Sequence, residues 1–326
     1  MQIRTLGKTG RLVSEIGLGT WQLGSRWGEP FNKEEGLKIL RTAEQLGINF
    51  VDTADVYNGG RSEETIGDYL MEHRGAFYVV TKCGRRLNPH TEEMYTRGAI
   101  ASFVEGSLDR LKQERLDMVL LHCPPTSVYA RDDIFAELER QKKMGKIADY
   151  GVSIEKVEEG VKALDYDISA IEVIFNMFRL KPLLDLFPLS MKKNVAIIAR
   201  VPLASGLLTG KFTKDTIFGL GDHRSFNREG AFFDKGETFS GVPYELGLAA
   251  VEELKKVFKT QDLAPYALRY VLMQPAVSVV IPGASRTSQV EENVLSAALP
   301  PLTKEQMEAV EDIYDRYLWD VIHPQW

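Results

Sequence analysis

Cysteine is scarce in this chain of 326 residues, which contains only Cys83 and Cys123. The two thiols could form one disulfide, but we expect both to stay reduced, because other features of the chain point to the cytoplasm. Residues 1–5 carry no apolar signal segment, and no stretch approaches the roughly 18 consecutive apolar residues of a membrane span. We therefore expect a cytoplasmic protein with no membrane partner.

Positive charge is also in short supply. The chain has 40 Lys and Arg against 46 Asp and Glu, a net charge of -6 at pH 7, and an isoelectric point near 5.6. No window is basic enough to follow a phosphate backbone, so we expect no nucleic-acid partner. The remaining composition, 44% apolar and 26% charged, is typical of a globular protein. The length allows either one α/β barrel or two smaller domains, and we predict a single barrel domain over residues 1–326.

The rest of the chain is organised around residues 48–57. An apolar segment of strand type ends on Asp52, a short polar loop carries Tyr57, and we expect a helix to begin behind a cap at Ser62. In a barrel of parallel strands, the residues that follow the strands line one mouth. Asp52 and Tyr57 are therefore predicted to face the same cleft.

This strand-then-helix plan repeats along the chain. The predicted strands are residues 16–21, 48–52, 77–82, 116–122, 147–153, 170–174, 195–202 and 277–281. The predicted helices are residues 33–45, 62–73, 97–111, 134–144, 157–164, 181–192 and 303–317. Apolar strands joined by crossover helices predict a (β/α)8 TIM barrel, preceded by an N-terminal β-hairpin of residues 2–6 and 11–14.

The alternative architecture is a doubly wound open sheet. Such a sheet would normally carry Gly-x-Gly-x-x-Gly after its first strand, and residues 17–22 lack the third glycine. A long loop after strand 7, residues 211–241, is aromatic and is predicted to fold over the mouth of the barrel, the alternative being a disordered surface insertion. The C-terminal helix is followed by a tail, residues 318–326, that either packs on the barrel or closes the cleft.

The polar residues at the strand ends resemble those of the aldo-keto reductase family. Asp52 and Tyr57 after the second strand, Lys82 after the third and His122 after the fourth look like the catalytic tetrad of that family. Similar motifs recur in order at residues 17–21, 151–153, 202–211 and 281–285. The resemblance covers nearly the whole chain.

The resemblance implies hydride transfer between a nicotinamide and a carbonyl carbon, with Tyr57 as general acid and no metal ion. An unperturbed Tyr has a pKa of about 10 and is therefore a poor acid at neutral pH. A nearby Lys82 cation should favour the phenolate and so make Tyr57 a better proton donor, and Asp52 should keep Lys82 charged. His122 would hydrogen-bond the same substrate oxygen. Taken singly, each residue has an ordinary structural role, but four of them at successive strand ends favour a shared site.

The resemblance also implies the cofactor NADP(H), with NAD(H) as the alternative. Residues 283–286 can present amide groups and a helix N-terminus to a phosphate, with Arg286 adding a fork of donors, and the family places the 2′-phosphate of NADP there. Residues 202–211 would wrap the pyrophosphate. The cofactor-binding residues implied in this way are Gly19, Thr20, Trp21, Asp52, Ser153, Glu172, Arg200, Pro202, Leu203, Ser205, Gly206, Leu207, Lys211, Arg224, Gly283, Ser285, Arg286, Gln289, Glu292 and Asn293.

The sequence departs from the family pattern around the expected nicotinamide. Glu172 stands where the family has a glutamine, Ile154 where it has an asparagine, and Arg200 where it has an aromatic residue under the ring. A guanidinium there would repel the cationic oxidised ring unless it were countered. We therefore predict an ion pair between Glu172 and Arg200 that tunes the preference between the two redox states.

The expected activity is NADPH-dependent reduction of an aldehyde or ketone, a small-molecule substrate that the sequence does not specify further. Two alternatives from the same fold are a sugar dehydrogenase running in the oxidative direction and a non-catalytic or slow nicotinamide-sensing subunit resembling potassium-channel β subunits. A third is a barrel isomerase or lyase that uses Lys82 as a Schiff base. Neither the direction of the reaction nor the oligomeric state can be derived from the sequence.

Overall fold

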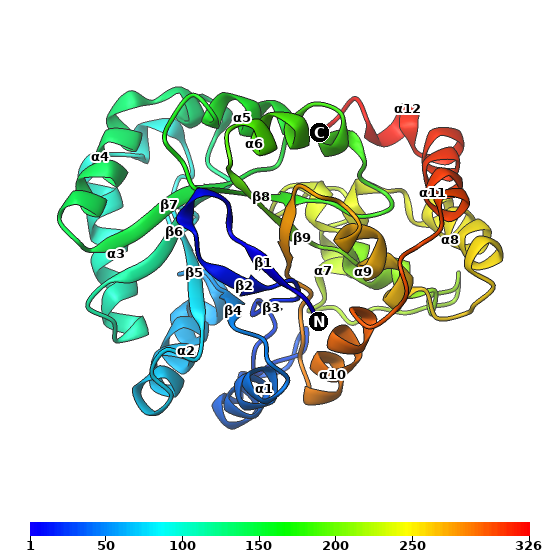
Figure 1. Cartoon of the computed structure of the whole chain (residues 1–326), viewed down its shortest axis with the longest axis horizontal. Coiled ribbons are helices and arrows are strands. Elements are labelled where there is room, and N and C mark those ends of the chain that lie inside the picture. The colour runs from blue at the N-terminus through cyan, green and yellow to red at the C-terminus, as the bar shows by residue number, and fades with distance from the viewer.

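The computed structural model describes residues 1–326 and contains a barrel of eight parallel strands. Neighbouring strands in the barrel are also neighbours in sequence, as a (β/α)8 barrel requires (Figure 1). These strands are β3 (Leu18–Gly19), β4 (Phe50–Asp52), β5 (Tyr78–Cys83), β6 (Leu116–His122), β7 (Ile147–Ser153), β8 (Ala170–Ile174), β9 (Ala196–Arg200) and β10 (Val277–Val280). The predicted TIM barrel is confirmed.

The barrel is closed between its first and last strands. Val280 pairs with Ile16 and Gly283 pairs with Gly19 in parallel bridges, and the amide of Gly17 donates to the carbonyl of Val280 at 2.8 Å. A closed barrel has no free sheet edge, which excludes the doubly wound alternative.

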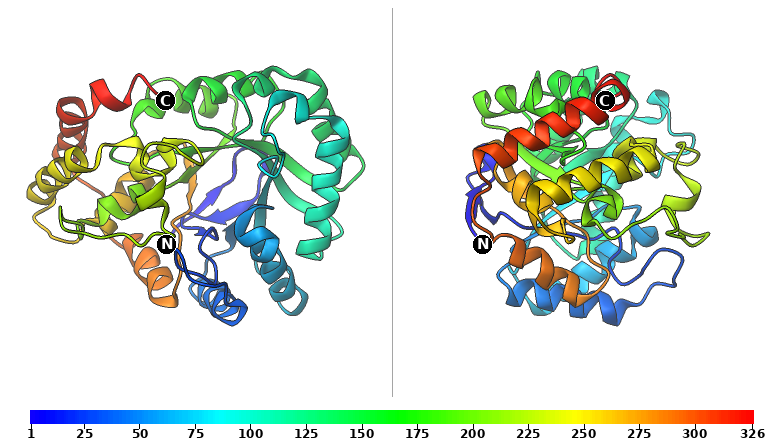
Figure 2. Two further views of the ribbon diagram at one scale, coloured as in Figure 1. Left: turned by 180° about the vertical axis from the view of Figure 1, so that it is seen from behind. Right: turned by 90° about the vertical axis from the view of Figure 1, so that its right-hand side faces the viewer.

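The helices lie around the outside of the strands (Figures 1 and 2). They are α1 (Lys33–Gln45), α2 (Arg61–Glu72), α3 (Arg97–Leu111), α4 (Asp132–Lys143), α5 (Val157–Ala163), α6 (Leu186–Lys192), α7 (His223–Phe226), α8 (Tyr244–Phe258), α9 (Ala264–Leu272), α10 (Thr287–Ser296), α11 (Lys304–Tyr317) and α12 (Trp319–Ile322). None of them is long and apolar enough to cross a membrane.

Capping residues fix several helix ends where the sequence predicts them. The side chains of Asn32 and Thr96 accept hydrogen bonds from the amides of Glu35 and Ala99, and both helices begin at the next residue. The predicted cap at Ser62 is wrong, because α2 begins at Arg61 behind Gly60. The Ser62 hydroxyl instead lies in the buried interior, where it bonds to the hydroxyl groups of Thr20 and Thr53.

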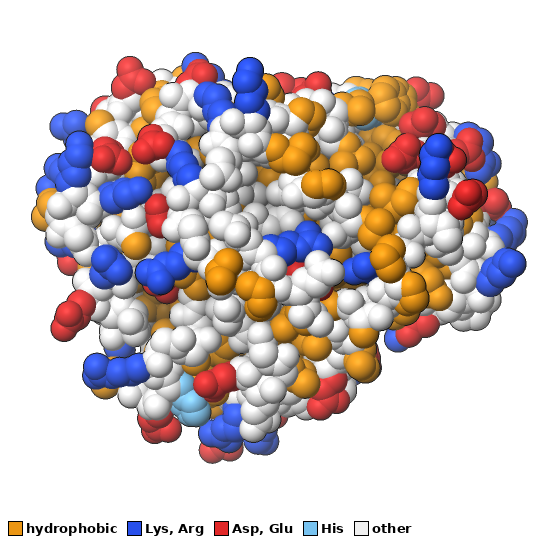
Figure 3. Space-filling view, in the orientation of Figure 1, with side chains coloured by type: hydrophobic (Ala, Val, Ile, Leu, Met, Phe, Trp, Pro, Cys, Tyr) orange, Lys and Arg blue, Asp and Glu red, His pale blue; other side chains and the backbone are white.

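The N-terminal hairpin closes one end of the barrel. Its strands, β1 (Ile3–Thr5) and β2 (Leu12–Ser14), pair antiparallel around a 3-10 turn at Gly7–Thr9. Leu6 and Val13 are fully buried in a cluster with the inward-facing side chains Phe50, Val80, Met118, Leu120, Ala170, Ala196, Ile198, Val279 and Ile281. Figure 3 views the molecule from the hairpin side, where Lys and Arg side chains are interspersed with Asp and Glu.

The segment of residues 211–241, which we call the lid, is ordered rather than a disordered insertion. It contains α7 and the 3-10 turns Lys235–Glu237 and Phe239–Gly241, and the right-hand view of Figure 2 shows it at the edge of the barrel opposite the hairpin. Sequence reasoning missed the two helices that follow the lid, α8 and α9. The helix predicted over residues 181–192 ends at Lys192 as expected, but it begins only at Leu186, and a separate 3-10 turn, Lys181–Leu183, precedes it.

Close packing of α2 on α3 gives a prediction about stability. A Cβ on Gly67 would lie 2.4 Å from the carbonyl oxygen of Arg110 and 2.8 Å from the carbonyl carbon of Leu111. We expect Gly67→Ala to lower the free energy of unfolding by about 1–3 kcal/mol in urea titrations, because backbone must move. Gly98→Ala, at an exposed and open position in α3, should raise it by about 0.5–1 kcal/mol. Equal effects of the two substitutions would contradict the packing explanation.

Candidate active site

A layer of polar side chains covers the apolar interior of the barrel at the carboxyl ends of the strands. Side chains alternate across a strand, so a residue two positions beyond an inward-facing one also faces inward. On six strands, the last small or apolar residue that faces inward is followed two positions later by a polar one. The six pairs are Phe50 and Asp52, Val80 and Lys82, Leu120 and His122, Gly151 and Ser153, Ala170 and Glu172, and Ile198 and Arg200. The structure thus brings together residues that lie as much as 148 positions apart, the distance from Asp52 to Arg200.

Lys82 stands at the centre of this layer and is fully buried. Its Nζ donates to Oδ1 of Asp52 at 2.5 Å and to the carbonyl oxygen of Thr53 at 3.1 Å. A third bond, at 3.4 Å, reaches the phenolic oxygen of Tyr57. The predicted Asp52, Tyr57 and Lys82 therefore form one connected group.

The pKa values of all three members of this group are raised. Burial, followed by the charge of Glu172, raises the pKa of the Asp52 carboxyl well above its usual range, and the Lys82 cation only partly opposes this rise. Burial lowers the pKa of the Lys82 ammonium, but Asp52 and Glu172 together outweigh burial and raise it. Burial raises the pKa of Tyr57, and the Lys82 cation only partly opposes this rise. The Lys82 cation therefore favours the phenolate as expected, but burial outweighs it, and the phenol keeps its proton at neutral pH.

His122 lies beside Tyr57, with the two ring centroids 5.9 Å apart. Burial, followed by the nearby cations Arg85 and Lys82, lowers the pKa of the imidazole well below its usual range, so it is neutral at pH 7. Its Nδ1 has no hydrogen-bond partner. A neutral imidazole can donate one hydrogen bond to a reacting oxygen without adding a charge.

The predicted ion pair between Glu172 and Arg200 exists, but it is the longest of the contacts that Arg200 makes with carboxylates. Arg200 Nε lies 3.8 Å from Glu172 Oε1, whereas its Nη1 donates to Glu237 at 2.6 Å and its Nη2 to Glu155 at 3.2 Å. Glu172 instead lies 3.3 Å from Lys82 Nζ. Glu237 belongs to the lid, so sequence spacing gave no signal of this contact.

A cleft of about 830 Å³ opens above the polar layer. Most of the predicted cofactor-binding residues line it: Gly19, Thr20, Trp21, Asp52, Glu172, Arg200, Pro202, Leu203, Ser205, Gly206, Lys211, Arg224, Gly283, Ser285, Arg286, Gln289, Glu292 and Asn293. Ser153 and Leu207 do not line it, because both are buried beneath its surface. The lining residues that sequence reasoning missed include Gln22, Phe212, Asp262, Pro265 and Ser296. Asp262 lies between the two missed helices α8 and α9, and Pro265 lies in the first turn of α9.

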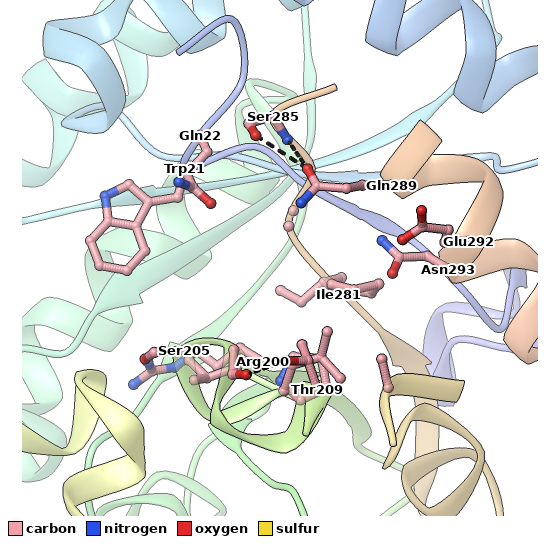
Figure 4. A pocket seen from close by; sticks show the side chains of 18 of the residues that line it. Trp21, Gln22, Arg200, Ser205, Thr209, Ile281, Ser285, Gln289, Glu292 and Asn293 are labelled. Atoms are coloured by element: carbon pink, nitrogen blue, oxygen red, sulfur yellow. Dashed lines mark hydrogen bonds between the residues drawn. The ribbon is translucent and has the colours of Figure 1, made fainter. Parts of the chain in front are cut away.

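Opposite walls of the cleft offer different groups (Figure 4). On one side the amide and hydroxyl of Ser285 donate to the side chain of Gln289, with Glu292 and Asn293 further along α10, and Arg200, Ser205 and Thr209 lie across from them. Nothing approaches within 4 Å of the position of a Cβ on Gly283, so a ligand has access to the backbone there.

The three cations predicted to bind phosphate differ in whether a carboxylate of the protein already pairs with them. Arg224 is already paired with Asp222, its Nη2 lying 2.5 Å from the carboxylate. Lys211 is mostly exposed and lies 3.9 Å from Asp262. Arg286 donates only to the hydroxyl of Ser288, so its guanidinium is the freest of the three.

The lid is attached to both the barrel floor and the C-terminal tail. Glu237 lies 3.3 Å from Arg85 as well as 2.6 Å from Arg200. Trp326 is buried, donates to Asp234 of the lid at 3.0 Å and lies under the guanidinium of Arg179. The tail therefore packs against the lid.

These features define a (β/α)8-barrel oxidoreductase, and comparison with known proteins gives its family. The chain belongs to the aldo/keto reductase family, whose model matches residues 15–315. It is 32% identical to an uncharacterised oxidoreductase of Bacillus subtilis, YqkF, over 96% of this chain and 98% of that one. It is 30% identical to L-galactose dehydrogenase of Arabidopsis thaliana over 90% of this chain and 87% of that one.

A solved structure agrees with this placement. Aldo-keto reductase AKR11C1 from Bacillus halodurans, in its holo form, superposes with a TM-score of 0.78 and 27% sequence identity, covering 96% of each chain.

The ion pairs of Glu237 predict a dependence of stability on pH. Burial alone would raise the pKa of this carboxyl, but Arg200 and Arg85 outweigh it and lower the pKa from 4.5 to about 2. A carboxyl with a lowered pKa stabilises the folded state above its unfolded pKa and loses that effect as the pH falls through the folded value. In urea titrations at pH 7, the free energy of unfolding of wild type should exceed that of Glu237→Gln by about 3 kcal/mol. This difference should shrink as the pH falls from 4.5 to 2.

Glu229→Gln, at an exposed position of the same lid, is the control and should show no such trend. A difference between wild type and Glu237→Gln that stays constant from pH 7 to pH 2 would contradict the assigned ion pairs.

Proposed function

We propose that this protein is an NADPH-dependent reductase of aldehydes or ketones in which Tyr57 is the general acid. The observation that carries the proposal is the phenolic oxygen of Tyr57 at 3.4 Å from the buried Lys82 ammonium, on the floor of a cleft of about 830 Å³. A phenol beside a fixed cation can release a proton to a substrate oxygen and leave behind a phenolate that the cation stabilises.

The lining of the cleft fits a nicotinamide dinucleotide. Residues 202–211 and the start of α10 offer backbone amides, and Arg286 offers a guanidinium that is not held by a carboxylate. Glu172 also lines the cleft, although its Oε2 is buried and lies 3.3 Å from the ammonium of Lys82. When bound, the cofactor would supply the hydride.

The residues of the chain would then supply the proton. Tyr57 keeps its proton at neutral pH and donates it to the carbonyl oxygen as negative charge develops there. Lys82 stabilises the resulting phenolate, an interaction worth about 4 kcal/mol between unit charges 4 Å apart at an effective dielectric constant near 20. Asp52 holds Lys82 in place, and neutral His122 orients the substrate oxygen by a hydrogen bond.

The mouth of the cleft favours a flat or apolar substrate. Trp21 packs edge to face on Trp27 with centroids 4.7 Å apart, and the lid adds His223 at 5.3 Å from Trp21 and Phe233 at 6.0 Å. Such an aromatic wall binds rings and alkyl groups better than charged groups.

A second candidate is oxidation of an alcohol or sugar by the same residues working in reverse. It is supported by the 30% identity to L-galactose dehydrogenase. In that direction Tyr57 would accept the hydroxyl proton after first losing its own.

Replacement of the phenol tests the proposed acid. Tyr57→Phe should lower kcat/KM for NADPH-dependent reduction of a panel of aldehydes and ketones by at least about a hundredfold, because it removes the proton donor. Quenching of tryptophan fluorescence by NADPH should persist. Tyr166→Phe, a half-buried tyrosine bonded to Asp132 away from the cleft, should leave both unchanged. Turnover by Tyr57→Phe at the wild-type rate would refute the assignment.

A further inference from the structure

The ion pairs at the carboxyl ends of the strands, together with those that Glu237 makes from the lid, join four carboxylates to three cations. The cations are Lys82, Arg85 and Arg200, and the carboxylates are Asp52, Glu155, Glu172 and Glu237. Arg179 is buried beside this network, but it donates to the carbonyl oxygens of Glu155 and Ser240 and forms no ion pair within it. Three close pairs account for six of these seven groups. Lys82 bonds to Asp52 at 2.5 Å, Arg85 to Glu155 at 2.6 Å and Arg200 to Glu237 at 2.6 Å.

Glu172 is the carboxylate left over. Its contacts with cations are longer, 3.3 Å to Lys82 and 3.8 Å to Arg200, and both of those cations have a closer carboxylate. Ser153 donates to its Oε1 at 3.3 Å, while Oε2 has no hydrogen-bond partner. Glu172 is 1% exposed and lines the cleft, so water screens its charge poorly.

A nitrogen of Arg200, close to Glu172, is also buried without a hydrogen-bond partner. This nitrogen is Nε, whereas the two terminal nitrogens of the guanidinium are fully engaged by Glu237, Glu155 and the carbonyl of Ile154. Because Glu237 and Glu155 both lie closer to Arg200 than Glu172 does, the charge of Arg200 compensates that of Glu172 only in part. The local excess of charge at this end of the cleft is therefore negative.

We propose that Glu172 is a redox-tuning residue, whose carboxylate, only partly compensated by Lys82 and Arg200, stabilises the oxidised, cationic nicotinamide relative to the reduced, neutral one. This inference rests on the proposed function, because it requires a nicotinamide in this cleft. Tighter binding of the oxidised form makes the bound cofactor a stronger hydride donor, since its reduction potential falls by about 30 mV for each tenfold in the ratio of dissociation constants. Glu172 acts through charge and takes no part in proton transfer.

The size of the effect follows from the distance over which a buried charge acts. Two unit charges about 8 Å apart at an effective dielectric constant near 20 change a binding constant by roughly thirtyfold. We therefore expect Glu172→Gln, which keeps the shape and removes the charge, to raise the ratio of the NADP dissociation constant to the NADPH dissociation constant by at least about tenfold. Fluorescence quenching and calorimetry measure the two constants without turnover.

A substitution that removes a positive charge from the same network provides a second test, because it should change the ratio of dissociation constants in the opposite direction. Arg200→Gln removes a cation from the same layer and should lower the ratio, because Glu237 and Glu155 lose a partner. If either residue had a purely structural role, its substitution would weaken the binding of NADP and NADPH equally and leave the ratio of their dissociation constants unchanged. Arg200→Gln also tests the proposal if Glu172→Gln fails to fold.

Glu15→Gln is the matched control. Glu15 is another fully buried carboxylate, paired with Arg4 before β3 at the opposite end of the barrel, and its loss should leave the ratio at the wild-type value. Opposite shifts in Glu172→Gln and Arg200→Gln support the proposal. An unchanged ratio, or shifts of the same sign, overturns it while leaving the proposed function intact, whereas failure of wild type to bind either cofactor form overturns the proposed function itself.

Discussion

The burial of one ammonium group sets the arrangement of the whole site. Lys82 is fully buried inside the barrel, where an isolated charge would be strongly destabilised and would give up its proton. The carboxylates of Asp52 and Glu172 prevent this and hold the cation 3.4 Å from the phenol of Tyr57. Buried ion pairs add little net stability, so the effect of this pair is to keep a fixed charge next to Tyr57.

The same arrangement explains why the site was visible in the sequence. A parallel strand inside a barrel is apolar until its carboxyl end, and the alternation of side chains makes the first inward-facing polar residue stand two positions beyond the last inward-facing apolar one. Asp52, Lys82 and His122 satisfy this rule within β4, β5 and β6, whose carboxyl ends were predicted to within one residue. Local pattern and global fold agree at these positions.

Other parts of the structure depend on contacts between distant segments, which no local pattern specifies. The helix α8 follows an irregular lid and was not recognised, although its side chains pack on α11. The partner of Arg200 was predicted to be Glu172, because the two residues stand on adjacent strands, yet Glu237 reaches Arg200 from the lid. The net pKa shift of Tyr57 also depends on the fold, because burial of the phenol cannot be read from the sequence and outweighs the expected effect of the Lys82 cation.

The position of the lid and the charge at the floor of the cleft are linked through Glu237. With the lid in place, Glu237 neutralises Arg200 and approaches Arg85. Movement of residues 235–237 away from the barrel would remove one carboxylate and leave Glu155 as the closest anion to both guanidinium groups. The surplus of negative charge at Glu172 would then be cancelled. The contacts of Trp326 with Asp234 and Arg179 hold this part of the lid against the tail, so the packing of the C-terminal residue helps to set the electrostatic field around Glu172.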